Sequence, residues 1–235
     1  MITQGGLLSQ QNSDALYVKN NSACTKSMIG VYCPMATKEK DYKKEYEKIF
    51  NEKIKRDGAD KLLKYLKETD FFTAPASTRF HSNHAGGLVE HCVKVYHRFV
   101  KILEAEYGTD YFKKNPDIVE STAIIALLHD VCKVGCYKTE ERNVKVGTEW
   151  TKKPYYAYDD PLPYGHGEKS VYMISGFMKL SREEAMAINW HMGGYDARNH
   201  VGSYVLSEAF QKFPIALLFH VADLMTSYLD EGVTR

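Results

Sequence analysis

The chain has 235 residues, of which 44% are hydrophobic, so it is long enough to bury one sizeable core. Its 31 basic and 30 acidic residues give a formal net charge of +1, which excludes a global field that would attract nucleic acid or an anionic membrane. Five cysteines, an odd number without a secretion-signal pattern, argue against a disulfide framework, and no apolar run is long enough to cross a bilayer. We therefore expect a cytoplasmic protein that makes no use of a membrane.

The N-terminal part of the chain predicts a tail followed by surface helices. Residues 1–37 are rich in Ser, Asn, Gln and Gly and have no helical or strand period, so we expect a polar, flexible tail, with a partner-binding arm as the functional alternative. Over residues 38–56 charges alternate in sign while apolar residues recur at helical spacing, which predicts an amphipathic helix. A second short helix opens at Asp60.

Residues 71–87 are rich in Pro, Ser and Gly and predict a loop that leads into a helix. The loop holds Arg79, His81 and His84 close together, which makes it a candidate binding loop. The helix that follows is predicted over residues 88–106, and His91 falls on its inward stripe. From this position alone, His91 is either a core histidine or a ligand.

The most informative stretch is the His129-Asp130 pair at the end of an apolar run. An N-cap and a proline at residues 115–116 predict the start of a buried helix, which we expect to reach Gly135. Two polar side chains are costly to bury there without partners, and a metal ion would supply one. The nearby Cys132 and Cys136 are interpreted as core thiols.

Residues 137–164 predict a hairpin or lid rather than another core helix. Because this segment lies between His129-Asp130 and His166 in the chain, we expect it to be a lid that selects the substrate. Its lysines and arginine would hold a phosphate, and its aromatic residues, Trp150 and Tyr155 among them, would stack on a nucleobase. A solvated hairpin whose aromatics cover the core is the alternative.

Three further ionisable residues accompany predicted helices in the C-terminal part. His166 lies between two glycines where a helix opens, and His191 lies at the end of a short helix that starts with a capping box at Ser181. Asp223 is embedded in a strongly apolar helix predicted over residues 214–228. An unpaired carboxylate would be expensive there, which again indicates a cation.

All of these candidate ligands are histidines or aspartates. Imidazole and carboxylate together suit divalent manganese, iron, cobalt, nickel or zinc, and suit magnesium less well because of the nitrogen donors. The sequence therefore predicts a divalent metal site built on His91, His129, Asp130, His166, His191 and Asp223.

The order His91, His129-Asp130, Asp223 resembles the ligand signature of the HD-domain metal-dependent phosphohydrolases. The text around it, at residues 84–91 and 220–223, is similar to the HD domain of HD-type bacterial 3'-5' exoribonucleases. The resemblance implies an all-α fold, an HD-domain helical bundle over residues 38–235 with a small hairpin or lid insertion at about 137–164. Cys132 departs from the pattern, because the family often has glycine there.

The resemblance also implies two ions. The first would be held by His91, His129, Asp130 and Asp223, and Asp130 would bridge to a second ion held by His166 and His191. Met192 departs from the second histidine that some dinuclear members have at this place.

By the same resemblance, metal-activated water would cleave a phosphoester of a nucleotide or oligonucleotide. The catalytic residues would be Asp130, Lys133, His84 and Arg79, and those that bind substrate would be Lys133, Arg79, Trp150 and Tyr155. The partner would be a phosphorylated small molecule or a short single-stranded nucleic acid. The alternatives are a metal-binding module that binds a nucleotide or a partner without catalysis, and a mononuclear nucleotidase. The sequence leaves the oligomeric state open.

Overall fold

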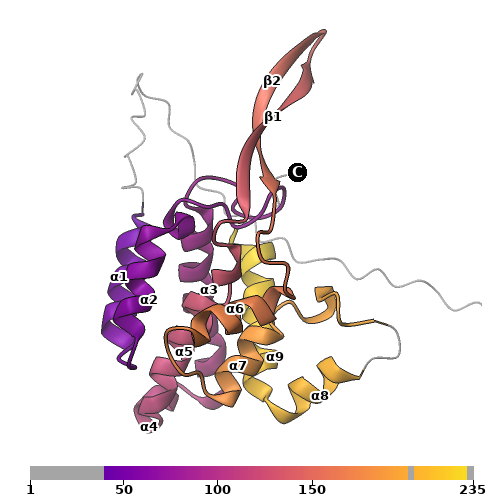
Figure 1. Ribbon diagram of the computed structural model, residues 1–235. Coiled ribbons are helices and arrows are strands. Elements are labelled where there is room, and N and C mark those ends of the chain that lie inside the picture. The colour runs from indigo at the N-terminus through magenta and orange to yellow at the C-terminus, as the bar shows by residue number, and fades with distance from the viewer. Residues whose placement is uncertain (1–39, 201–203, 232–235) are drawn as a thin grey trace, which may run out of the picture. The chain divides into compact units, whose positions relative to one another are not determined.

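The computed structural model describes residues 40–200 and 204–231. The chain divides into one unit at Met1–Glu39, which contains the predicted tail and lies outside the described residues, and a second unit at Lys40–Arg235. The described part of the second unit is mostly helical and carries one two-stranded sheet (Figure 1). This confirms the predicted helical class with a hairpin.

The α-helices of the described residues are α1 (Tyr42–Lys53), α2 (Ala59–Glu68), α3 (Gly87–Tyr107), α4 (Tyr111–Lys114), α5 (Pro116–Leu128), α6 (His166–Ser175), α7 (Arg182–Asn189), α8 (Val205–Lys212) and α9 (Pro214–Met225). The strands are β1 (Tyr137–Val146) and β2 (Glu149–Tyr158). Short 3-10 turns cover Asp70–Phe72, Val131–Lys133 and Gly193–Tyr195, and a π-helical turn, Thr226–Asp230, extends α9.

Helix α5 lies at the centre of the core. Residues 123–128 are all fully buried, so this helix is apolar all round rather than on one face, as expected of a helix enclosed by others. It packs against α1, α3 and α7, and α3 and α7 in turn pack against α9. The C-terminal end of α5 therefore delivers whatever follows it into the interior of the helical body.

The predicted helix through residues 115–135 is shorter than expected. Helix α5 ends at Leu128, His129 is its C-cap, and Asp130 precedes the 3-10 turn Val131–Lys133. The break places Asp130 just beyond the helix, where its Oδ2 lies 3.4 Å from Nε2 of His129.

The C-terminal helix is also shorter than predicted, because α9 ends at Met225 and the chain continues as the π-helical turn. Leu229, one residue beyond the predicted helix, is 67% exposed. Among the described residues no single helix has the length and apolar character of a membrane span, and one pair, Val205–Lys212 with Pro214–Asp230, meets that test only together, across a bend of 108°.

The hairpin β1–β2 extends away from the helices (Figure 1). Its strands are antiparallel, in a register that runs from Tyr137 opposite Tyr158 to Val146 opposite Glu149. Gly147 opens the two-residue turn with a φ of 65°, a conformation that favours glycine. The foot of the hairpin is tied to the helical body, where the Tyr137 hydroxyl donates to the Ala76 carbonyl at 3.2 Å. The rest is largely exposed, as in a solvated hairpin.

Helix α7 starts with the predicted capping box, formed by Ser181 and Glu184. Glu184 also links α7 to segments that are distant in the chain. The Ser181 hydroxyl accepts from the Glu184 N–H, and the Glu184 carboxylate accepts from the Ser181 N–H. Glu184 is fully buried and also accepts two bonds from the Arg56 guanidinium, at 2.5 and 2.9 Å, and one from the Ser121 hydroxyl. This carboxylate thus connects α7 to α5 and to the segment after α1.

We predict that Glu184→Gln destabilises the fold above pH 5 by about 2 kcal/mol, the order of a charged hydrogen bond. Burial by itself raises the pKa of Glu184, but the bonds from Arg56, Ser181 and Ser121 outweigh it and hold the pKa below its ordinary value of 4.5. The stabilisation is therefore present above pH 4.5 and lost as the pH falls through the lowered pKa.

Urea unfolding at a series of pH values measures this effect. The matched control is Glu183→Gln, an exposed neighbour on the same helix, which should behave as the parent protein. An equal loss of stability in both variants, or a Glu184→Gln loss that persists at pH 2, would contradict the assignment.

Candidate metal centre

The structure brings all the predicted ligands together at one point in the helical body. They come from segments far apart in the chain: His91 from α3, His129 and Asp130 from the end of α5, His166 from the start of α6, His191 from just beyond α7, and Asp223 from α9. His91, His129, Asp130 and His191 are each at most 2% exposed. Ionisable side chains this deeply buried require compensating partners.

Three of the buried histidines are oriented in the same way. The Nδ1 of His129 lies 2.9 Å from the Ala126 carbonyl, and the Nδ1 of His191 lies 2.7 Å from the Ile188 carbonyl. A carbonyl only accepts, so both Nδ1 atoms donate and leave an Nε2 lone pair facing inward. Histidine ligands of metals are held in this way by an acceptor behind the ring.

His91 has a carboxylate behind it in place of a carbonyl. Its Nδ1 lies 3.2 Å from Oε2 of Glu231, at the end of the π-helical turn, and its Nε2 lies 3.1 Å from Oδ1 of Asp223. The same Nε2 lies 3.3 Å from Nε2 of His129. Two imidazole lone pairs this close repel each other unless a proton or a cation lies between them.

When no ion is bound, a proton on His91 lies between the two imidazoles. Burial lowers the pKa of His91, but its hydrogen bonds to Asp223 and Glu231 outweigh burial and raise the pKa to about 10. His91 is then protonated at neutral pH and holds one positive charge between carboxylates. A divalent cation supplies the same compensation by displacing that proton.

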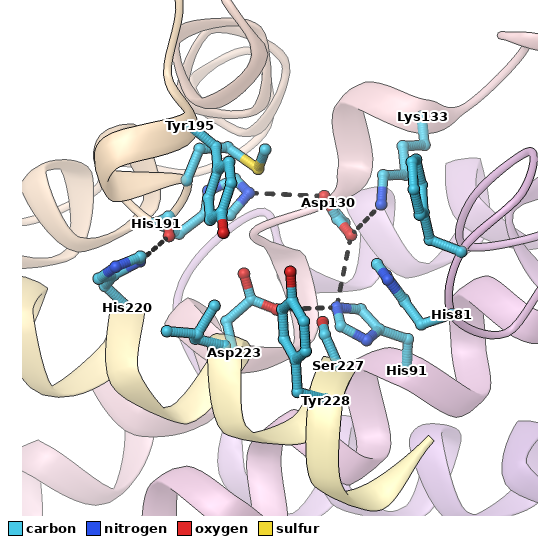
Figure 2. A pocket seen from close by; sticks show the side chains of 13 residues that line it. His81, His91, Asp130, Lys133, His191, Tyr195, His220, Asp223, Ser227 and Tyr228 are labelled. Carbon is cyan, nitrogen blue, oxygen red and sulfur yellow. Dashed lines mark hydrogen bonds and ion pairs between the residues drawn. The ribbon is translucent and has the colours of Figure 1, made fainter. Parts of the chain in front are cut away.

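The two oxygens of Asp130 face different sets of histidines. Oδ1 lies 2.9 Å from Nε2 of His166 and 3.6 Å from Nε2 of His191. Oδ2 lies 3.4 Å from Nε2 of His129, 3.7 Å from Nε2 of His91 and 2.7 Å from Nζ of Lys133. One buried carboxylate therefore separates two clusters of nitrogen donors, and Figure 2 shows this carboxylate with His191 on one side and Lys133 and His91 on the other.

The residues fit a metal ion. Potential ligand atoms lie within 4.8 Å of one another in several groups, which include His91–His129–Asp130, His129–His191–Asp223 and Asp130–Cys132–His166. In addition, Nε2 of His191 is buried and has no hydrogen-bond partner among the described residues, as expected of a ligand atom aimed at a cation position. These buried groups could hold a metal ion.

The carboxylates are ready to act as ligands at neutral pH. Burial raises the pKa of Asp130, but Lys133 and His129 outweigh it and hold the pKa well below its ordinary value. Burial likewise opposes ionisation of Asp223, and the bond to His91 lowers its pKa. For Lys133, burial lowers the pKa but the adjacent Asp130 raises it above its ordinary value, so the amine stays cationic.

A cavity of about 290 Å³ opens onto these residues (Figure 2). Its polar floor includes His91, Asp130, Lys133, His191 and Asp223. Its rim is aromatic and includes Phe80, Tyr195 and Tyr228, which are 62%, 68% and 56% exposed. The pocket thus combines a floor of charged groups that could hold a metal ion with flat apolar faces at its entrance.

Sequence reasoning did not identify the rim residues. Tyr195 lies in the 3-10 turn four residues beyond His191, and Tyr228 lies five residues beyond Asp223, so proximity to ligands was the available signal. Gly193 makes the first of these placements possible, since a Cβ there would lie 2.4 Å from the His220 ring. His220 in turn contacts the His191 carbonyl through Nδ1, at 2.6 Å.

Several residues predicted for substrate contact or proton transfer lie elsewhere. Trp150 is 69% exposed beside the hairpin turn, opposite Lys145, and Tyr155 is on the same strand, bonded through its hydroxyl to Glu140. The hairpin carries them away from the pocket because its paired strands run outward from their foot. Arg79 and His84 are exposed and do not line the pocket.

The predicted binding loop instead contributes Phe80 and His81 to the pocket. The His81 ring lies 4.8 Å from the His91 ring, centre to centre, and its buried Nε2 has no hydrogen-bond partner. The predicted binding loop is therefore at the site through His81 and Phe80, while Arg79 and His84, the two loop residues expected to be catalytic, do not line the pocket.

Comparison with protein-family models, with curated proteins and with solved structures finds no match for this chain. The resemblance to HD-domain phosphohydrolases therefore remains a prediction from the motif residues. What the chain does has to be argued from the geometry of the site.

Proposed function

We propose that this chain is a metal-dependent phosphohydrolase of the HD-domain type, which uses water to cleave a phosphoester of a nucleotide. The observation that carries the proposal is the position of Asp130, whose Oδ1 faces His166 and His191 while Oδ2 faces His91 and His129. A carboxylate with donors on both sides is suited to bridge two cations.

In this proposal His91, His129, Asp130 and Asp223 hold one ion, and Asp130, His166 and His191 contribute to a second. Their nitrogen and oxygen donors suit divalent manganese, iron, cobalt, nickel or zinc. When bound, such ions acidify water and draw charge away from phosphoryl oxygens. The Nδ1 bonds of His91, His129 and His191 keep the Nε2 lone pairs directed at the ion positions, which limits reorganisation during the reaction.

The pocket also supports a particular kind of substrate. Among the described residues that line the pocket, Lys133 is the only lysine and none is an arginine, so this part of the wall offers one side-chain ammonium for phosphate oxygens. Phe80, Tyr195 and Tyr228 offer flat faces at the entrance. A substrate with one phosphoryl group and a flat ring fits this distribution better than a triphosphate does.

The function is tested by a hydrolysis assay on Lys133→Met. Metal-loaded parent protein should hydrolyse phosphomonoester or phosphodiester dyes and nucleotides, and Lys133→Met should lower kcat by about 10²- to 10³-fold, because a positive charge at the developing oxyanion is lost. Metal content, measured by mass spectrometry, should be retained.

The matched control is Lys145→Met, an exposed lysine on the hairpin, which should keep the parent rate. A fully metal-loaded parent protein that hydrolyses none of these phosphoesters would exclude the enzyme and favour a binding module.

A second prediction concerns the aromatic rim. Stacking of a base on one aromatic residue contributes about 1–3 kcal/mol. Tyr195→Ala should therefore lower kcat/KM for a nucleoside monophosphate by about 10- to 100-fold, mostly through KM, and leave a small alkyl phosphoester little affected. Trp150→Ala, which removes an exposed aromatic side chain on the hairpin, should leave kcat/KM unchanged for both substrates. The reverse pattern, with Trp150 sensitive and Tyr195 silent, would show that the hairpin and not the rim reads the base.

A further inference from the structure

Cys132 lies against the proposed second ion position. This residue is 2% exposed, in the 3-10 turn directly after Asp130. Its Sγ lies 3.4 Å from Nδ1 and 3.6 Å from Nε2 of His166, and Nε2 of His166 lies 2.9 Å from Oδ1 of Asp130. Sulfur, nitrogen and oxygen donors thus meet in one group, with ligand atoms within 4.8 Å of one another.

These separations agree with the geometry of a shared cation. Zinc–sulfur bonds of about 2.3 Å and zinc–nitrogen bonds of about 2.0–2.1 Å, set at the tetrahedral angle, place the two donor atoms about 3.5 Å apart. The nitrogen of His166 that faces Asp130 is Nε2, and the 3.6 Å between it and the Cys132 sulfur is close to that value. The thiol is therefore already near the distance that coordination requires.

Cys136, four residues further on, has different surroundings. Its Sγ donates to the Cys132 carbonyl at 3.2 Å and accepts from the Lys169 ammonium at 3.2 Å. The thiol of Cys136 is therefore engaged with protein groups both as a donor and as an acceptor. The Sγ of Cys132 faces the imidazole of His166 instead, while its backbone N–H is held by the Ser170 hydroxyl at 3.1 Å. The two buried cysteines thus form a natural pair for comparison.

A second observation at the same place indicates a cation. Nε2 of His191 is buried, has no hydrogen-bond partner within residues 40–200 and 204–231, and lies 3.6 Å from the same Oδ1 of Asp130. Oδ1 of Asp130 thus faces the unpaired nitrogen of His191 and also Nε2 of His166, the ring that the Cys132 sulfur contacts. A structural role for Cys132 as a small apolar residue does not account for this convergence.

We propose that Cys132 is a thiolate ligand of the cation held by Asp130 and His166, so that this position favours a thiophilic ion such as zinc or cobalt over manganese or magnesium. The inference rests on the metal-binding part of the proposed function and adds a ligand that the resemblance does not supply. When the sulfur–metal bond forms, the S–H bond breaks and its proton passes to water. The thiolate and the Asp130 carboxylate together balance the two charges of one divalent ion.

Absorption of the cobalt-loaded protein tests the proposal without reference to activity. A cobalt–thiolate bond gives a ligand-to-metal charge-transfer band in the near ultraviolet, which imidazole and carboxylate ligands do not. We expect the band in the parent protein and in Cys136→Ser, and its loss in Cys132→Ser, which is nearly isosteric. Competition titrations should show the preference for zinc over manganese falling about 10- to 100-fold in Cys132→Ser.

Circular dichroism shows whether Cys132→Ser folds. If it does not fold, Cys132→Ala is tested in its place. Cobalt bound with visible ligand-field bands but no thiolate band in the parent protein would overturn the proposal while leaving the metal centre intact. A band that persists in both Cys132 variants would overturn it as well. Failure of the parent protein to bind cobalt at all would remove both this inference and the metal centre on which it rests.

Discussion

The arrangement of the site depends on one buried carboxylate. Asp130 is 2% exposed, yet it keeps a lowered pKa because Lys133 and the surrounding histidines compensate its charge. Each of its oxygens faces a separate pair of imidazoles, so the side chain divides the site into two donor clusters. In the protein without ions, a proton on His91 and the ammonium of Lys133 balance the buried negative charge. A cation that displaces the proton on His91 would supply the same positive charge, so it would bind without a rearrangement of the core.

The core positions this carboxylate through helix ends rather than helix faces. Helix α5 is enclosed on all sides and ends at Leu128, so the next two residues, His129 and Asp130, reach the interior together, with Oδ2 of Asp130 3.4 Å from Nε2 of His129. Close approach of α6 to the end of α7 brings His166 to His191, and Gly167 permits it, since a Cβ there would lie 2.2 Å from the Asn189 carbonyl oxygen. The carbonyls of Ala126 and Ile188, in α5 and α7, then fix the rings of His129 and His191. The same helices that form the core therefore also orient these two imidazoles.

Much of this site is predictable from sequence, for one physical reason. A histidine or aspartate inside an apolar helical pattern needs a partner, and the residues chosen on that basis, from His91 to Asp223, do meet in space. The capping box of α7 was predictable because both of its bonds are local. The pocket rim was not, because Phe80, Tyr195 and Tyr228 become neighbours only through tertiary packing. Chain proximity misled for Trp150: strands of ten residues at about 3.3 Å each carry a hairpin turn roughly 30 Å from its foot.

Anomalous diffraction from zinc- or cobalt-loaded crystals is the most direct measurement of the central claim, that Asp130 bridges two cations. Data collected at the absorption edge of the metal should show two peaks, one on each side of this carboxylate, the first bounded by His91, His129 and Asp223 and the second by His166 and His191. A single peak, or peaks elsewhere with His91 still bonded directly to Asp223, would contradict the account.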